Sequence, residues 1–169
     1  MMNMEKVVYL FILIELLVVS YGDFRTRKIP NSWPILNLLI FVFFLFWQPH
    51  QYPLIFNTFL YSLVFLFVGF VFFLIRIMGA GDSKFLFSFF LLVPLKVHPL
   101  ALNNLLLCTV YIGLTFFVYN GLKNFRGIYN SLVIGHFSGL KRYFGTKFPF
   151  APVILVSWIF TGYDLKIWL

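Results

Sequence analysis

Six apolar runs, separated by short polar segments, make up most of this 169-residue chain. They cover about residues 7–21, 31–47, 54–75, 83–95, 100–119 and 152–169. A transmembrane helix needs about 20 predominantly apolar residues, and the third and fifth runs meet this requirement. The second run is slightly short and the fourth is clearly short, which protein packing or local thinning of the bilayer can accommodate. The pattern predicts an all-α, polytopic membrane protein with about six transmembrane helices.

The first run is better explained as a helix of the mature protein than as a signal peptide, and all six runs are better explained as helices than as strands of a barrel. A signal peptide would end at a small-residue cleavage site, but this chain continues directly into Tyr21-Gly22-Asp23. A transmembrane β-barrel would show alternating segments of about ten residues. Continuous apolar runs instead favour helices, because a helix satisfies all its backbone hydrogen bonds within one segment.

The composition excludes several classes of protein. Hydrophobic residues make up 62% and charged residues 11% of the chain, compared with about 45–50% and about 25% in soluble domains. So few charges cannot cover a water-exposed surface, which excludes a soluble globular enzyme. Intrinsic disorder, collagen and disulfide scaffolds are excluded as well. The single cysteine, Cys108, lies inside an apolar run, so we expect it to be a packing residue.

The basic residues predict the orientation in the membrane. The net charge is +8, which in a soluble protein would suggest a nucleic-acid partner. Here ten of the 13 basic residues fall in alternate loops, which is the positive-inside pattern. These ten are Arg25, Arg27, Lys28, Arg76, Lys84, Lys123, Arg126, Lys141, Arg142 and Lys147. We therefore expect a multi-pass protein of the cytoplasmic (inner) membrane, with both termini outside and no nucleic-acid partner.

The longest loop lies between the fifth and sixth runs. Its hydrophobic residues recur at helical spacing, which favours an amphipathic helix on the inner membrane surface. They are Leu122, Phe125, Ile128, Tyr129, Leu132 and Val133. The basic residues of this loop are expected to be attracted to anionic lipids.

Two of the five acidic residues are predicted to meet at one membrane face. Asp23 ends the first helix and Asp82 begins the fourth, 59 residues later. An acid at a membrane edge is a functional candidate, because burying it is costly. Each also has a structural interpretation: Asp82 as an N-cap, and Asp23 as an interfacial charge paired with Arg25 or Arg27.

As a pair, the aspartates are suited to peptide hydrolysis. Two carboxylates held close together share one proton, so that one acts as a base and the other as an acid. The base takes a proton from water while the acid polarises the substrate carbonyl. Gly79 and Gly81 precede Asp82 and lack Cβ atoms, so the backbone there can approach a neighbouring segment closely.

These residues resemble the motifs of the type IV prepilin peptidases, a family of GxGD-type membrane aspartic peptidases. Residues 23–31 match D-x-R-x-x-x-I-P-N, and residues 79–82 match G-x-G-D. Lys84 fits the longer form G-D-x-K, and residues 149–152 fit the P-[FY]-[GA]-P turn before the last helix. The resemblance therefore extends from the first helix to the last.

The resemblance implies an aspartic endopeptidase with Asp23 and Asp82 as the catalytic pair. Its substrates would be prepilin or pseudopilin precursors, cleaved at the cytoplasmic face after a glycine to remove a basic leader. The supporting motif residues would be Arg25, Ile29, Pro30, Asn31, Gly79, Gly81 and Lys84. No metal or organic cofactor is implied.

The extent of the chain suggests a particular branch of that family. Many members carry an N-terminal cytoplasmic domain with paired cysteines, which is linked to methylation, and we expect no such domain here. Residues 1–169 are expected to form a single membrane-embedded peptidase domain. The chain thus resembles the short, peptidase-only branch, which serves Tad-type pili or related secretion systems.

Glu15 and the histidines fall outside the motifs. Glu15 precedes Asp23 by eight residues and lies within an apolar run. Either it has a structural partner such as Asn, Ser or Tyr on another helix, or it serves substrate passage or proton access. His50, His98 and His136 show no ligand spacing and are assigned no catalytic role.

Three other functions remain as alternatives. A non-catalytic membrane assembly subunit of a pilus or secretion system would use the aspartates only as structural caps. An archaeal preflagellin peptidase would share the chemistry but not the substrate. A small transporter is less consistent, because both acids lie at the membrane edge and transport sites tend to lie at the midplane.

Overall fold

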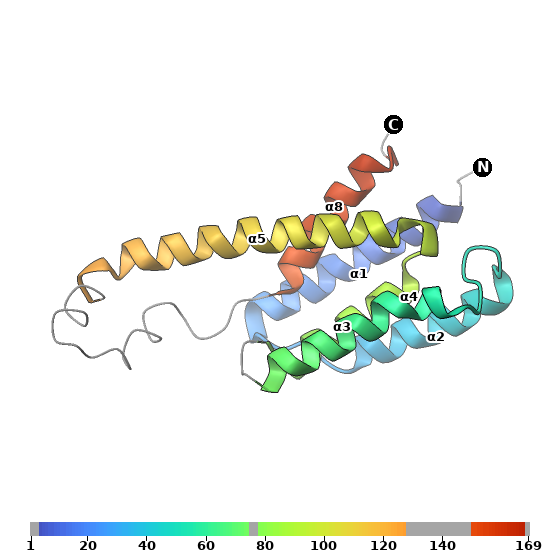
Figure 1. Ribbon diagram of the computed structural model, residues 1–169, viewed down its shortest axis with the longest axis horizontal. Helices are drawn as coiled ribbons and strands as arrows, with labels where there is room; N and C mark the ends of the chain where they lie inside the picture. The colour runs from blue at the N-terminus through green and yellow to red at the C-terminus, as the bar shows by residue number, and fades with distance from the viewer. Residues whose placement is uncertain (1–3, 75–77, 128–149, 168–169) are drawn as a thin grey trace.

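The computed structural model describes residues 4–74, 78–127 and 150–167, which form a helical bundle (Figure 1). The elements that lie wholly within this part of the chain are six α-helices and one 3₁₀ turn, and it contains no β-strand. The elements are α1 (Met4–Thr26), α2 (Ser32–Trp47), α3 (Phe56–Leu74), α4 (Ala80–Leu92), η1 (Leu95–Val97), α5 (His98–Lys123) and α8 (Ala151–Asp164). The all-α prediction is confirmed, and each helix falls on one of the predicted apolar runs.

Proline positions explain where several of these helices start. Pro34, Pro99 and Pro152 lie in the first turns of α2, α5 and α8. The first N–H groups of a helix have no intrahelical acceptor, so a residue without an N–H is tolerated there. The sequence therefore favours these helix starts through local preferences alone.

Three helices are long and apolar enough to cross a membrane: Lys6–Thr26, Phe56–Leu74 and Leu95–Lys123. The other three, α2, α4 and α8, have 16, 13 and 14 residues. At about 1.5 Å per residue, α4 spans roughly 20 Å, less than the roughly 30 Å of a hydrocarbon core. The chain is thus a membrane protein by its long helices, while a count of six complete crossings stays a prediction.

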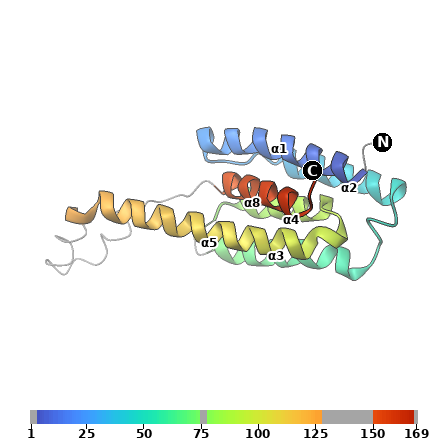
Figure 2. The ribbon, with the colours of Figure 1, turned by 90° about the horizontal axis from the view of Figure 1, so that it is seen from above.

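Packing sorts the helices into two groups. In the first, which we call the α4 group, α4 packs against α2 and α3; in the second, the α8 group, α8 packs against α1 and α5. The two shortest helices, α4 and α8, are each the shared neighbour of two others (Figures 1 and 2). Most side chains of α4 are buried, as are half of those of α8. Protein therefore encloses much of α4 and α8, which explains how these two helices lie in the bundle without full-length contact with lipid.

Aromatic contacts join the two groups. Phe89 of α4 meets Trp158 of α8 edge to face, with ring centroids 5.4 Å apart. The His98 ring at the start of α5 lies 5.1 Å from Tyr61 of α3 and 5.9 Å from Phe90 of α4. One apolar core therefore runs through both groups.

Large apolar side chains cover the outside of the bundle. Phe67, Phe70 and Leu74 of α3 are 70%, 54% and 62% exposed. Apolar patches of this extent are unusual on a soluble monomer and fit a lipid-facing surface. α5 extends past the other helices at one end of the bundle (Figures 1 and 2), and its buried residues all lie between His98 and Cys108.

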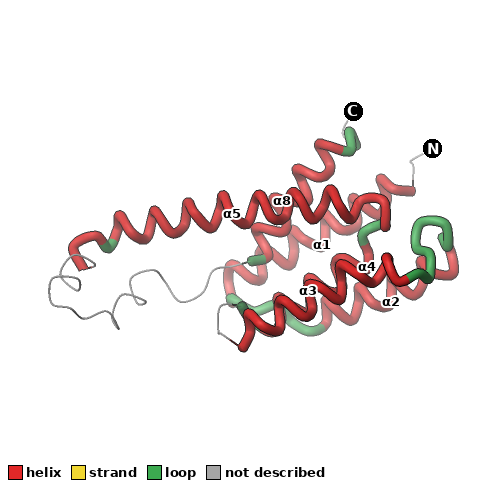
Figure 3. Tube along the Cα trace, viewed as in Figure 1, coloured by secondary structure: helices red, strands yellow, loops and turns green. Residues whose placement is uncertain are grey.

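The ends of the helices place the motifs together. The α1–α2 connection and the start of α4 lie at one end of the bundle, whereas both ends of the chain lie at the other (Figure 3). This agrees with the predicted placement of Asp23 and Asp82 at the same face. The amphipathic helix predicted from Leu122 onward, together with Lys141, Arg142 and Lys147, falls largely outside the described residues.

Candidate active site

Asp23 lies in the last turn of α1 with its side chain turned into the bundle, where it is 3% exposed. The helix ends because Arg27 adopts a left-handed conformation, with φ of 52°, while its N–H donates to the Asp23 carbonyl at 2.7 Å. Such a residue commonly terminates a helix. Thr26 completes the turn by donating its hydroxyl to the Gly22 carbonyl at 2.9 Å. Arg25 and Arg27 are exposed, in contrast to the buried carboxylate between α1 and α8.

The carboxylate of Asp23 binds the first turn of α8. The Ala151 N–H donates to Asp23 Oδ2 at 3.2 Å, across 128 residues of sequence. Ala151 is the first residue of α8, so its N–H is one of the donors that the helix itself leaves without an acceptor. Phe150, Ala151 and Pro152 of the predicted proline-containing turn are described, whereas Phe148 and Pro149 lie outside the described residues. The turn therefore brings the last helix onto the first aspartate.

Asp82 is the third residue of α4 rather than its N-cap, which is Gly79. Its Oδ2 accepts the Gly79 N–H at 3.1 Å. The N-cap interpretation was therefore wrong about the position, because the chain enters the helix three residues earlier. The carboxylate still stabilises the helix end by reaching back to a free backbone donor. The side chain is half-buried, in contrast to Asp23.

The two aspartate-bearing segments are in direct contact. A Cβ atom at Gly81 would lie 2.7 Å from the carbonyl oxygen of Ile29, which is itself buried. Lys84 Nζ donates to Asn31 Oδ1 at 3.4 Å, between the same two segments. Since Ile29 and Asn31 belong to the first motif, and Gly81 and Lys84 to the second, these contacts join the motifs.

The other predicted motif residues lie on the same helix ends and connections. Arg25, Pro30 and Gly79 are exposed, and Pro30 and Asn31 lead into α2. Asn31 is the N-cap position of α2 but makes no side-chain cap bond there. Its side-chain oxygen is instead used by Lys84. The Asn31 side chain of the first motif thus binds the second motif and does not cap its own helix.

The chemistry available at this end of the bundle is that of carboxylates. Among residues 4–74, 78–127 and 150–167, no three His, Cys, Asp or Glu side chains gather as a metal site. Two aspartates on segments that pack together can supply one general base and one general acid. Such a pair can activate water against an amide carbonyl.

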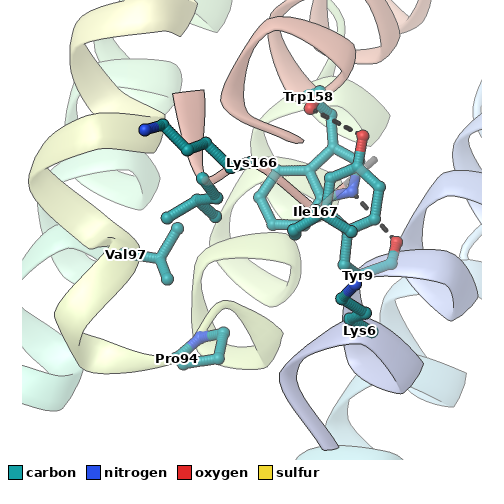
Figure 4. A pocket seen from close by; sticks show the side chains of 8 residues that line it. Lys6, Tyr9, Pro94, Val97, Trp158, Lys166 and Ile167 are labelled. Atoms are coloured by element: carbon teal, nitrogen blue, oxygen red, sulfur yellow. Dashed lines mark hydrogen bonds between the residues drawn. The ribbon is translucent and has the colours of Figure 1, made fainter. Parts of the chain in front are cut away.

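A cavity of about 220 Å³ lies at the opposite end of the bundle (Figure 4). Tyr9 and Trp158 form one wall: their rings stack at 5.1 Å, and each donates a hydrogen bond to the other's carbonyl at 3.2 Å. Lys6 and Lys166 also line the cavity, and no carboxylate is among its described lining residues. The described lining of this cavity therefore offers no carboxylate pair, and the cavity lies at the end where the two chain termini are.

Two contacts made by the helices that carry the aspartates, α1 and α4, were not predicted from the sequence. The first is the Ala151 N–H on Asp23, and the second is the pair formed by Asn37 of α2 and Ser88 of α4, with Nδ2 donating to Oγ at 3.3 Å. The Pro-Phe-Ala-Pro run at residues 149–152 indicated a turn at the start of the last helix, where the Ala151 N–H lies. The Asn37–Ser88 contact was indicated by polar residues inside apolar runs, because such residues rarely face lipid in a membrane helix.

Comparison with known proteins identifies the family. The model of the type IV leader peptidase family matches residues 10–162, which include both aspartates. Searches of curated proteins and of solved structures found no match. The chain therefore belongs to the type IV leader peptidase family, and the resemblance to prepilin peptidases is confirmed.

Proposed function

We propose that this member of the type IV leader peptidase family is an aspartic endopeptidase with Asp23 and Asp82 as its catalytic pair. Its substrates would be type IV prepilin or pseudopilin precursors, from which it removes the basic leader. Membership of the family supports a peptidase with prepilin-type substrates in general. The observation that carries the finer assignment is the packing of Gly81 against Ile29, because it joins the segments that bear the two aspartates.

The proposed reaction needs only the two carboxyl groups and water. The ionised aspartate takes a proton from water, and the hydroxyl oxygen bonds to the carbonyl carbon of the scissile peptide. The protonated aspartate donates to the carbonyl oxygen as charge develops there. The tetrahedral intermediate then breaks its C–N bond, and the leaving amine takes a proton from the aspartate that received one from water. As the carbonyl re-forms, a hydroxyl of the intermediate returns its proton to the other aspartate, which restores the starting state of the pair. The pair acts as a coupled unit, because each proton transfer changes the charge beside the other carboxyl group.

The proposed setting is the cytoplasmic face of the inner membrane. Three long apolar helices support membrane insertion, and the basic loops support the orientation with both termini outside. The hydrophobic helix of the precursor would lie in the bilayer beside the enzyme, which places its cleavage site near the aspartates. The bundle would act as a single peptidase domain, with the precursor and the lipid bilayer as its partners.

The structure also gives the principal alternative a specific basis. Asp23 binds the first turn of α8, and Asp82 binds the backbone at the start of α4. A non-catalytic assembly subunit of a pilus or secretion system would need these contacts and no chemistry. The alternative therefore predicts that a neutral side chain that accepts the same hydrogen bonds can replace either carboxylate without loss of function.

A cleavage assay in membranes tests the proposal. The chain is co-expressed with a pilin-like precursor that carries a basic leader and a glycine before a hydrophobic segment. We expect mass spectrometry to find the mature product beginning directly after the glycine. A precursor that stays intact across a panel of such substrates, with the folded chain present in the membrane, would contradict the proposal and favour the assembly subunit.

A further inference from the structure

Glu15 is a buried carboxylate in the middle of α1 that the proposed reaction does not use. It is 3% exposed and lies eight residues before Asp23, or about 12 Å along the helix. Within the described part of the chain, neither carboxylate oxygen has a hydrogen-bond partner. An acid buried in a membrane bundle is costly, so a residue that contributed only packing would be better replaced by a leucine.

Asn37 of α2 is the polar side chain beside Glu15. Asn37 is fully buried, and its Nδ2 donates to Ser88 of α4, which is also fully buried, at 3.3 Å. The Ser88 hydroxyl donates in turn to the Phe85 carbonyl at 3.0 Å. An amide nitrogen carries two N–H groups, so Asn37 can bind Ser88 with one and Glu15 with the other. We call Glu15, Asn37 and Ser88 the polar bridge.

The polar bridge runs from one helix group to the other. α1, which carries Asp23, packs mainly on α8, whereas α4, which carries Asp82, packs mainly on α2 and α3. The relative position of the two groups therefore determines how closely the aspartates approach. Apolar contacts alone specify this position weakly in a bilayer, because lipid tails are as apolar as the helix surfaces. A polar contact inside an apolar core is directional and can fix one register.

The Asn37–Ser88 bond is formed in this conformation, and the Glu15 carboxylate lies beside Asn37 with both of its oxygens still without a hydrogen-bond partner. We propose that Glu15 is a positioning residue for the peptidase: its contact with Asn37 fixes α1 against α2 and α4 and so sets the approach of Asp23 to Asp82. This inference rests on the proposed function, but the spacing of the helix groups that it requires can be measured separately.

The experiment combines a distance with cleavage kinetics. In a Cys108→Ala background, spin labels are placed at Tyr21 of α1 and Leu74 of α3, which are exposed and outside the motifs. Pulsed EPR then reports the spacing of the two groups in Glu15→Leu and Glu15→Gln variants of the full chain. Asn104→Leu is the matched control, because Asn104 is a buried polar residue whose bonds to Thr161 and Asp164 stay within the α8 group.

For Glu15→Leu we expect a broadened or shifted distance distribution, with kcat reduced about 10- to 100-fold by misplacement of the reacting groups. KM should change little, since the substrate-binding surface is unaltered. Glu15→Gln should restore both readouts to within about threefold of the parent, because its amide can still bond to Asn37. Asn104→Leu should leave the label distance unchanged.

Two results would overturn the inference. One is a parent-like distance distribution and kcat in Glu15→Leu; the other is an equal effect of Asn104→Leu on the distance, which would indicate general loosening. If the parent cleaves no precursor, the proposed function fails, and the EPR comparison alone then decides whether the polar bridge positions the two helix groups. Size-exclusion chromatography of each variant establishes that the protein compared is folded.

Discussion

Gly81 is the residue at which the two aspartate-bearing segments come closest. The sequence predicted that the backbone at Gly79 and Gly81 can approach a neighbouring segment closely, and the structure shows that Ile29 is the residue that Gly81 meets. The partners of the aspartates themselves were not predicted. The Pro149–Pro152 run indicated a turn before the last helix, but a backbone donor such as the Ala151 N–H has no side-chain chemistry that would link it to Asp23. At this scale the sequence predicts the reacting groups, while the structure shows which backbone donors bind their carboxylates.

The first prediction concerns Gly81→Val. The added Cβ would lie 2.7 Å from a backbone carbonyl oxygen, so the two segments must separate. We expect precursor processing to fall at least about tenfold, since a displacement of about 1 Å can cost that much or more. The measurement is the fraction of precursor matured in membranes, normalised to the amount of inserted enzyme.

Gly22→Ala is the control for this variant. Gly22 is adjacent to Asp23, but a Cβ there would meet nothing within 4 Å. Alanine also favours a helix over glycine by about 1 kcal/mol, so the end of α1 should not weaken. Normal processing by Gly81→Val would mean that the contact with Ile29 does not matter to the site.

At the scale of helices, the sequence predicted which segments are helical better than it predicted which helices pack together. All six runs became helices because length and apolar character suffice to specify a helix in a membrane. The pairing of α4 with α3 or of α8 with α1 could not be read in the same way. These helices are apolar on nearly every side, so the sequence pattern does not show which face of a helix contacts lipid and which contacts protein. Small residues such as Gly69 and Gly162 were the available signals, because they allow helices to pack closely.

The second prediction concerns the contact of α3 with α4. A Cβ at Gly69 would lie 2.5 Å from Ser83 Oγ and 3.1 Å from Ser83 Cα, so Gly69→Val should force the helices apart. We expect a loss of about 1–3 kcal/mol in stability, typical of overpacking. Thermal unfolding in detergent should show a lower midpoint than the parent.

The matched change is Gly113→Val on α5, where a Cβ would meet nothing within 4 Å. Both substitutions place valine in an apolar helix, so any general effect of a β-branched residue is shared. Equal midpoints for the two variants would rule out a close α3–α4 contact at Gly69.

For the molecule as a whole, the charge pattern predicts orientation and the bundle is consistent with it. The α1–α2 connection and the start of α4 share one end, and both chain termini lie at the other. Length did not settle the number of crossings, because three of the six helices are shorter than a typical span and are partly enclosed by protein. The division into an α4 group and an α8 group could not be foreseen from runs of similar hydrophobicity.

The third prediction concerns topology. A reporter fused after Leu165 should be active outside the cytoplasm, and one fused after Lys123 should be active in the cytoplasm, because basic segments are retained inside. Paired alkaline phosphatase and green fluorescent protein fusions measure both sides. The reverse pattern would place the aspartates on the outer face, where cytoplasmic leader removal is excluded.

The central claim, that Asp23 and Asp82 form one catalytic unit, is tested most directly by comparing Asp23→Asn, Asp82→Asn and the double variant in the membrane cleavage assay. Asparagine can still accept the bonds from Ala151 and Gly79, but it cannot take a proton from water. Each single change should therefore remove nearly all processing at unchanged membrane levels, and the double change should reduce it little further. A normally expressed single variant that matures its precursor at close to the parental rate would contradict the account.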